Sequence, residues 1–197
     1  MRTTTERNQR MSREKILEGA VAILDSGHYA DLTVDALARS LHMSKSTLYK
    51  YFMSKEDVII ALVKEACERA EGEVEHTLAG GTAAEQLTEL ASIIGRHGQR
   101  LPRAVSTEPE KLPMACTQRL NQTRDSFASA AQILTDRGLA RGEFDFADSR
   151  VAAVAFVAAA QAVLTDGARI GIKGYGQSLE HLPDLFLPGL RGKATKR

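Results

Sequence analysis

Proline is absent from the first 101 residues of this 197-residue chain, and all five prolines follow that point. Because proline interrupts the interior of a helix, the first half can form a series of helices that end at other residues. Alanine is abundant, only 5% of the residues are aromatic and none is Trp, a composition that favours helices over strands. The sequence therefore predicts an all-α fold.

Apolar residues at helical spacing, with Ser and Thr as N-caps, predict where these helices begin and end. In the first half we expect helices over residues 12–25 and 33–40, a third from Ser44, and a longer fourth from Ser54 to the Gly80-Gly81 pair. In the second half we expect helices over residues 83–100, within 100–113, and over 114–137, 147–169 and 177–186. Gly138 and Gly142 are expected to mark a loop.

The formal charge of the chain is almost balanced, at +1, but it is unevenly distributed. Residues 36–55 contain four basic residues and no acidic residue, and Asp35 and Glu56 bracket them. A short basic run is usually a solvated surface, and Tyr49 and Tyr51 within it could simply belong to the core. The structural setting of the run decides between that interpretation and a surface that faces a polyanion.

Two short helices joined by a tight turn, with a third helix ahead of them, are typical of a helix-turn-helix. In that motif the second helix enters the major groove of DNA, where phosphates require cations and small hydroxyl donors. The segment that begins at Ser44 supplies both, while Leu48 and Phe52 are spaced to face inward. The residues predicted from this pattern to contact double-stranded DNA are Ser44, Lys45, Ser46, Thr47, Tyr49, Lys50, Tyr51 and Lys55.

Residues 11–63 resemble the DNA-binding domain of the tetracycline-repressor (TetR) family. The resemblance rests on Leu32-Thr33-Val34, Leu37-Ala38 and the string SKSTLYKYFMSKE from Ser44 to Glu56. The family implies an all-α homodimer that binds a palindromic operator, usually as a repressor that a small molecule releases. It also implies a phosphate contact for Thr33 and a contact with the DNA backbone for Lys55.

His42 departs from the family pattern, which usually has glycine in the turn of the motif. A turn of this kind often requires a positive φ, which glycine adopts at no cost and histidine adopts more readily than most other residues. We therefore expect the turn to form with slight strain. In an alternative interpretation, His42 also reaches a phosphate.

We divide the chain after residue 56. Residues 1–56 are the predicted helix-turn-helix domain, with 1–11 as a flexible basic arm, and residues 57–197 are a ligand-binding and dimerisation domain, with 190–197 as a disordered tail.

The run Val151–Ala160 in the second domain is apolar on every side of its expected helix. One side can pack within the domain, and a two-fold copy of the chain is the simplest cover for the other. The alternative is a core helix wrapped entirely by its own chain.

A small, largely apolar effector is expected to bind in the second domain. The candidate lining residues are Ile94, His97, Val105, Arg124, Phe127 and Phe156. The two recognition helices of a dimer must meet major-groove faces about 34–36 Å apart, or a multiple of that distance. An effector that changes the tilt of the helix from Ser54 would therefore weaken DNA binding.

Other classes of protein are disfavoured. Cys67 and Cys116 lie outside any CxxC pattern, as expected of reduced thiols in a cytoplasmic protein. The N-terminus lacks an apolar signal core, and the longest apolar run is too short to span a membrane. We find no enzyme motif or cofactor fingerprint, and Glu73, His76 and Cys67 lack the spacing of metal ligands. The remaining alternative is an all-α ligand-binding or scaffold protein that has lost DNA binding.

Overall fold

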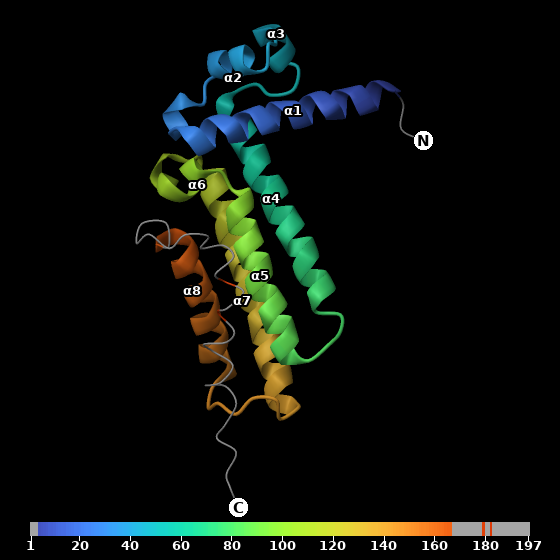
Figure 1. Ribbon diagram of the computed structural model, residues 1–197, viewed down its shortest axis with the longest axis vertical. Helices are drawn as coiled ribbons and strands as arrows, with labels where there is room; N and C mark the ends of the chain where they lie inside the picture. The colour runs from blue at the N-terminus through green and yellow to red at the C-terminus, as the bar shows by residue number, and fades with distance from the viewer. Residues whose placement is uncertain (1–3, 167–178, 180–181, 183–197) are drawn as a thin grey trace, which may run out of the picture. The chain divides into compact units, whose positions relative to one another are not determined.

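The computed structural model describes residues 4–166 together with Leu179 and Leu182, and every element it defines there is helical (Figure 1). The all-α prediction is confirmed. The elements of the described part are α1 (Thr4–Ser26), the 3₁₀ helix η1 (Tyr29–Asp31), α2 (Val34–Ser40), α3 (Lys45–Leu48), α4 (Lys55–Thr77), α5 (Ala83–Arg100), α6 (Arg103–Thr107), the 3₁₀ helix η2 (Pro109–Lys111), α7 (Met114–Ala140) and α8 (Ser149–Asp166). The expected helix 177–186, apart from Leu179 and Leu182, and the expected tail 190–197 lie outside the described residues.

The chain forms two compact units. Unit 1 comprises Met1–Ala66 and Leu101–Arg119, and unit 2 comprises Cys67–Arg100 and Leu120–Arg197. The functional division after residue 56 stays a prediction, because these units are defined by packing and join segments that are distant in the sequence. In particular, α6 and η2 pack with the N-terminal helices, although they follow α5 in the chain.

The core of unit 1 begins with the apolar stripe of α1. Ile16, Ala20 and Leu24 are fully buried, at the spacing that places residues on one side of a helix. The helix itself begins at Thr4 instead of the expected Ser12, so residues 4–11 of the expected flexible arm are helical. No glycine or proline occurs among these residues, and nothing in the local sequence stops the helix there.

Hydrogen bonds between carboxylate side chains and backbone N–H groups connect the segment 101–119 to the end of α1 and the turn after it. The backbone N–H of Arg103 donates to Oδ1 of Asp25 at 2.9 Å, and the N–H of Tyr29 donates to Oε2 of Glu108 at 2.8 Å. Ala104 and Val105 of α6 are buried. The short helix expected between residues 100 and 113 therefore exists, and it belongs to the core of unit 1.

Unit 2 is built on a core formed by α5, α7 and α8. Its largest members include Leu90, Ile94, Phe127, Leu134 and Phe156, all nearly inaccessible to solvent. The helix α5 continues without a break through Gly95 and Gly98.

Two glycines of unit 2 lie where neighbouring side chains approach closely. A Cβ at Gly98 would lie 2.7 Å from Leu164, and one at Gly138 would overlap the ring of Phe144. Gly138 was expected in a loop but lies within α7, whereas Gly142 has φ 68° in the turn that follows the helix. Gly138 therefore permits close packing and does not end the helix.

The helix α8 has two different faces. Ala153, Phe156, Val157 and Ala160 are buried in the core of unit 2. The opposite face is exposed although it too consists of small and apolar residues, which are Val151, Val154, Ala155, Ala158 and Ala162. The described part of the chain thus covers only one side of a helix whose sequence is apolar all round.

Candidate nucleic-acid interface

Two side-chain caps and one turn define the helix-turn-helix. The hydroxyl of Thr33 accepts a hydrogen bond from the backbone N–H of Ala36 and starts α2, and the hydroxyl of Ser44 accepts from the N–H of Thr47 and starts α3. Between them, His42 has φ 51° and the N–H of Met43 donates to the carbonyl of Ala38 at 3.0 Å. The prediction of a positive φ at His42 is confirmed, and among the described non-glycine residues this is the one such φ.

The recognition helix is short and rich in hydroxyl groups at its start. The Oγ of Ser44 lies 2.8 Å from Oγ of Ser46 and 2.9 Å from Oγ1 of Thr47. After Leu48 the backbone continues in turns, and the N–H of Phe52 still donates to the carbonyl of Leu48. Leu48 and Phe52 are buried, as their spacing predicts, and the other side chains from Ser44 to Tyr51 are exposed or half-buried.

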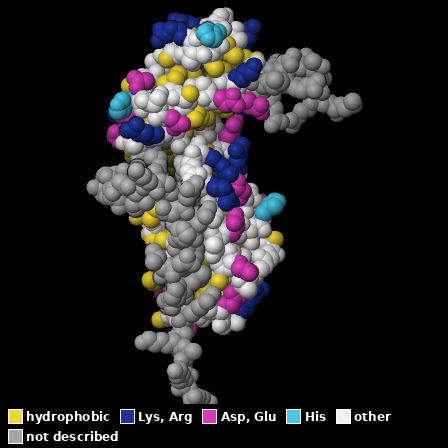
Figure 2. Space-filling model, viewed as in Figure 1, with side chains coloured by type: hydrophobic (Ala, Val, Ile, Leu, Met, Phe, Trp, Pro, Cys, Tyr) yellow, Lys and Arg dark blue, Asp and Glu magenta, His cyan; other side chains and the backbone are white. Residues whose placement is uncertain are grey.

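Every residue predicted to contact DNA remains accessible to solvent. Those that are exposed are Thr33, Ser44, Lys45, Ser46, Tyr49 and Lys50, and those that are half-buried are Thr47, Tyr51 and Lys55. Figure 2 shows Lys and Arg side chains gathered over the part of unit 1 that contains α2 and α3. The structure therefore presents a cationic surface with hydroxyl and phenol groups, which can bind phosphates and base edges.

Lys45, the first residue of α3, is not an isolated cation. Its ammonium forms an ion pair with the carboxylate of Asp35 in the first turn of α2, and both side chains are more than half exposed. The hydrogen bond that Lys45 donates to Asp35 raises the pKa of Lys45, and the negative charge of Asp35 adds to this effect. The sequence showed Asp35 only as the residue that borders the basic run, because no local pattern links positions 35 and 45.

Two cation–π contacts join this surface to buried aromatic rings of unit 1. The ammonium of Lys55 lies 4.5 Å from the ring centroid of buried Tyr29, and the guanidinium of Arg13 lies 5.4 Å from that of Phe52. Burial raises the pKa of Tyr29 to about 12, and the nearby negative charge of Glu56 contributes. Tyr29 therefore stays neutral, and Lys55 both faces solvent and stabilises unit 1, a role that its sequence position did not reveal.

The predicted effector residues are divided between the two units. Val105 is buried in unit 1, while the others belong to unit 2. There the ring of His97 meets the ring of Phe127 edge-on, with centroids 5.7 Å apart. Arg124 is exposed, because Thr123 and Phe127 occupy the buried side of α7 and Arg124 faces outward. Arg124 therefore does not place a polar group inside the core. The assignment of the other residues to a pocket stays a prediction.

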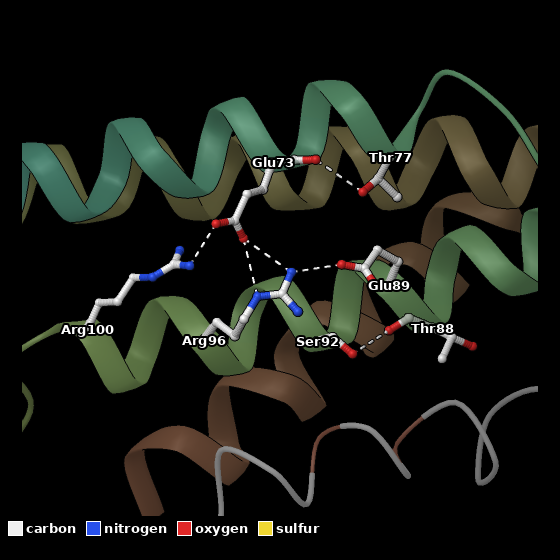
Figure 3. A network of polar contacts seen from close by, with 7 residues as sticks. All are labelled: Glu73, Thr77, Thr88, Glu89, Ser92, Arg96 and Arg100. Carbon is white, nitrogen blue, oxygen red and sulfur yellow. Dashed lines mark hydrogen bonds and ion pairs between the residues drawn. The ribbon is translucent and has the colours of Figure 1, made fainter.

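A charged groove of about 510 Å³ lies on the surface of unit 2, between α4 and α5. It is lined by Arg69, Gly72, Glu73, His76, Thr77, Glu89 and Arg96. At its centre Glu73 accepts hydrogen bonds from Arg100 at 2.7 Å and from Arg96 at 3.2 and 3.3 Å (Figure 3). Burial alone would raise the pKa of Glu73, but these two arginines outweigh it and lower the pKa. The groove differs from the predicted effector site, since none of the predicted residues lines it.

Within the described residues, no cluster of three or more His, Cys, Asp or Glu side chains is arranged to hold a metal ion. None of the described helices combines the length and the apolar character that crossing a bilayer requires. Cys67 and Cys116 are both buried and reduced.

Comparison with known proteins identifies the N-terminal module. Residues 16–62 match the family model of bacterial regulatory proteins, tetR family. The HTH-type transcriptional repressor KstR of Mycolicibacterium smegmatis is 32% identical over 95 residues, which are 48% of this chain and 47% of that protein. The chain thus spans about half the length of this curated relative.

Solved structures share the fold over nearly the whole chain. The fatty acid degradation regulator FadR from Bacillus halodurans has a TM-score of 0.73 at 22% identity, covering 91% of this chain and 96% of its own. FadR from Bacillus subtilis, in complex with stearoyl-CoA, has a TM-score of 0.71 at 20% identity, covering 89% and 98%. Together with the geometry of α2, the turn and α3, the match to the family model confirms the family resemblance read from the sequence: residues 16–62 form a helix-turn-helix domain of the tetR family.

Proposed function

We propose that the protein is a homodimeric transcriptional repressor that binds a palindromic operator through α3 and is released by a small, largely apolar effector. The observation that supports this most directly is the exposed row of hydroxyl, lysine and phenol groups between Ser44 and Lys50. These groups surround the start of a helix, where phosphates and base edges are bound in helix-turn-helix proteins. Such a protein acts in the cytoplasm, where operator DNA is found.

The exposed face of α8 supports a dimer. Val151 and Val154 are 64% and 58% exposed, and Ala155, Ala158 and Ala162 continue the same face. Small residues let a second helix approach closely, and a two-fold related copy of α8 would bury both faces at once. A dimer would also present two copies of α3 to the two halves of a palindrome.

The effector that we propose has a long apolar chain. The neighbouring B. subtilis structure is a complex with stearoyl-CoA, and two further relatives are named as fatty acid regulators. In this chain, the apolar side chains of unit 2, among them Ile94, Phe127 and Phe156, offer chemistry that suits an acyl chain. An effector that binds the DNA-free arrangement more tightly would shift the population away from the DNA-bound one.

A salt titration with DNA from upstream of the protein's own gene tests the proposal. We expect the purified protein to retain a duplex from this region at low salt, and the logarithm of its binding constant to fall linearly with the logarithm of salt concentration, by about 0.9 for each phosphate contacted. Addition of a long-chain acyl-CoA should release the duplex.

Matched variants assign the binding to α3. Tyr49→Ala should weaken binding to the duplex while the thermal melting of the protein stays nearly unchanged, because Tyr49 is exposed. Met114→Ala removes another exposed side chain of unit 1 outside the helix-turn-helix and should leave binding intact. If the wild-type protein retained no duplex at low salt, the alternative of a scaffold or ligand-binding protein would be correct.

A further inference from the structure

The ion pair between Asp35 and Lys45 puts an acidic group into the surface proposed to bind DNA. Asp35 lies in the first turn of α2 and Lys45 in the first turn of α3, and their side chains are 54% and 59% exposed. Lys50, also on this surface, has no ion pair among the described residues. The two lysines of the recognition segment are therefore in different electrostatic environments.

A carboxylate in the first turn of α2 stabilises the start of that helix, but neither this effect nor DNA affinity explains its ion pair with Lys45. Ion pairs between exposed side chains contribute little to stability, because water and salt screen them and two long side chains must be ordered. A negative charge beside a polyanion weakens binding to any DNA sequence. A group that lowers affinity for all DNA can still improve discrimination, if it lowers the affinity for unrelated sequences more.

The contact with Asp35 restricts the reach of Lys45. A lysine side chain is flexible, and its ammonium has three N–H donors that otherwise find the nearest phosphate. With one donor held by Asp35, the ammonium stays between the starts of α2 and α3, and two donors remain for a pair of acceptors. The O6 and N7 atoms of a guanine in the major groove are such a pair.

We propose that Asp35 is a positioning residue that holds Lys45 for contact with a base edge and keeps it from neutralising a phosphate. The inference rests on the proposed function, since it concerns how the same surface discriminates between DNA sequences. Asp35 would raise the ratio of affinities for cognate over unrelated DNA while lowering the affinity for unrelated DNA.

The experiment compares two short duplexes of equal length and composition. One is enriched from a random pool by the wild-type protein, and the other is its scrambled sequence. The variant Asp35→Asn removes the charge but keeps the size of the side chain. Glu18→Gln is the matched control, because Glu18 is exposed on α1 and makes no ion pair or hydrogen bond in the described structure. Both variants change the net charge of the chain equally.

We expect Asp35→Asn to raise the affinity for the scrambled duplex by roughly threefold or more and to steepen its salt dependence by about 0.9, the contribution of one additional phosphate contact. The ratio between the two duplexes should fall by a similar factor, whereas Glu18→Gln should leave that ratio unchanged. In a Lys45→Gln background, Asp35→Asn should have no more effect than Glu18→Gln, because Asp35 acts through Lys45.

Three results would overturn the inference. In the first, Asp35→Asn behaves like Glu18→Gln on both duplexes. In the second, Asp35→Asn raises affinity equally with and without Lys45, which means that the carboxylate repels phosphates directly. In the third, the wild-type protein binds the two duplexes equally, and the proposed function fails as well. Should Asp35→Asn melt early, Asp35→Ser provides the same loss of charge with a residue suited to the start of a helix.

Discussion

The backbone N–H of Tyr29 donates a hydrogen bond to the carboxylate of Glu108 at 2.8 Å, across 79 positions of sequence. The same carboxylate accepts from Lys111 at 2.8 Å and lies 2.7 Å from Nδ1 of His28. Its side chain is only 9% exposed. A single carboxylate between α6 and η2 thus holds the turn that links α1 to the helix-turn-helix, and both partners belong to unit 1.

Replacing Glu108 with Gln should reduce the stability of the protein in a pH-dependent way. The hydrogen bond from Lys111, followed by the bond from the N–H of Tyr29 and the contact with His28, lowers the pKa of Glu108 from 4.5 to about 2. Because the pKa is lower in the folded state, the carboxylate stabilises the protein above pH about 4.5, and this contribution is lost as the pH falls toward about 2. Urea unfolding at several pH values measures it.

We expect the difference in unfolding free energy between wild type and Glu108→Gln to be largest at neutral pH and to shrink with acid. Glu110→Gln is the matched control, because Glu110 is exposed on η2, the 3₁₀ helix that Glu108 precedes, and makes no hydrogen bond in the described structure. A difference between wild type and Glu108→Gln that stays constant down to the lowest pH would contradict the role assigned to the carboxylate.

The helix-turn-helix could be predicted from the sequence because local groups determine it. Thr33 and Ser44 each cap a backbone N–H three residues further on, and Leu48 and Phe52 are separated by one helical turn. The strained turn at His42 was also expected, because the resemblance places it where related chains have glycine. Interactions within a few residues can be recognised in the sequence, and the confirmed caps and turn of the helix-turn-helix are of this kind.

Replacing His42 with Gly should stabilise the protein. Relief of the left-handed conformation contributes about 1–2 kcal/mol, and the greater freedom of glycine in the unfolded chain offsets about 0.5–1 kcal/mol of it. We therefore expect a net gain of roughly 0.5–1 kcal/mol in urea unfolding. Ala36→Gly, within α2, should instead cost about 0.5–1 kcal/mol. Equal losses from both substitutions would show that the His42 side chain makes a stabilising contact that outweighs its strain.

Contacts between segments that are distant in the chain could not be predicted from the sequence. The pairing of Asp35 with Lys45 and the cap of Glu108 on Tyr29 depend on how helices pack, and the spacing of the residues gives no indication of either. Gly138 was misread for a related reason. A glycine near the end of a helix usually marks its stop, but here the ring of Phe144 occupies the space of the missing side chain.

Replacing Gly138 with Ala should destabilise unit 2. The new methyl group would overlap the ring of Phe144 and lie 3.1 Å from Cβ of Ala83, and overpacking of this kind costs about 1–3 kcal/mol. The same substitution at Gly72, a helical position with no heavy atom within 4 Å of the new group, should stabilise by about 0.5–1 kcal/mol. Thermal or urea unfolding of both variants tests this, and a stable Gly138→Ala protein would show that Phe144 can move at little cost.

Replacing Val154 with Glu should dissociate the proposed dimer. Val154 is 58% exposed on α8, and a carboxylate buried there without a partner, once from each copy, would raise the dimer dissociation constant by roughly a hundredfold or more. Sedimentation equilibrium should then give the mass of one chain. Gln99→Glu adds the same charge at an exposed position of α5 and should leave the dimer intact. A Val154→Glu protein that stays dimeric would place the interface elsewhere, and a wild-type protein that is already monomeric would remove the physical basis for reading a palindrome.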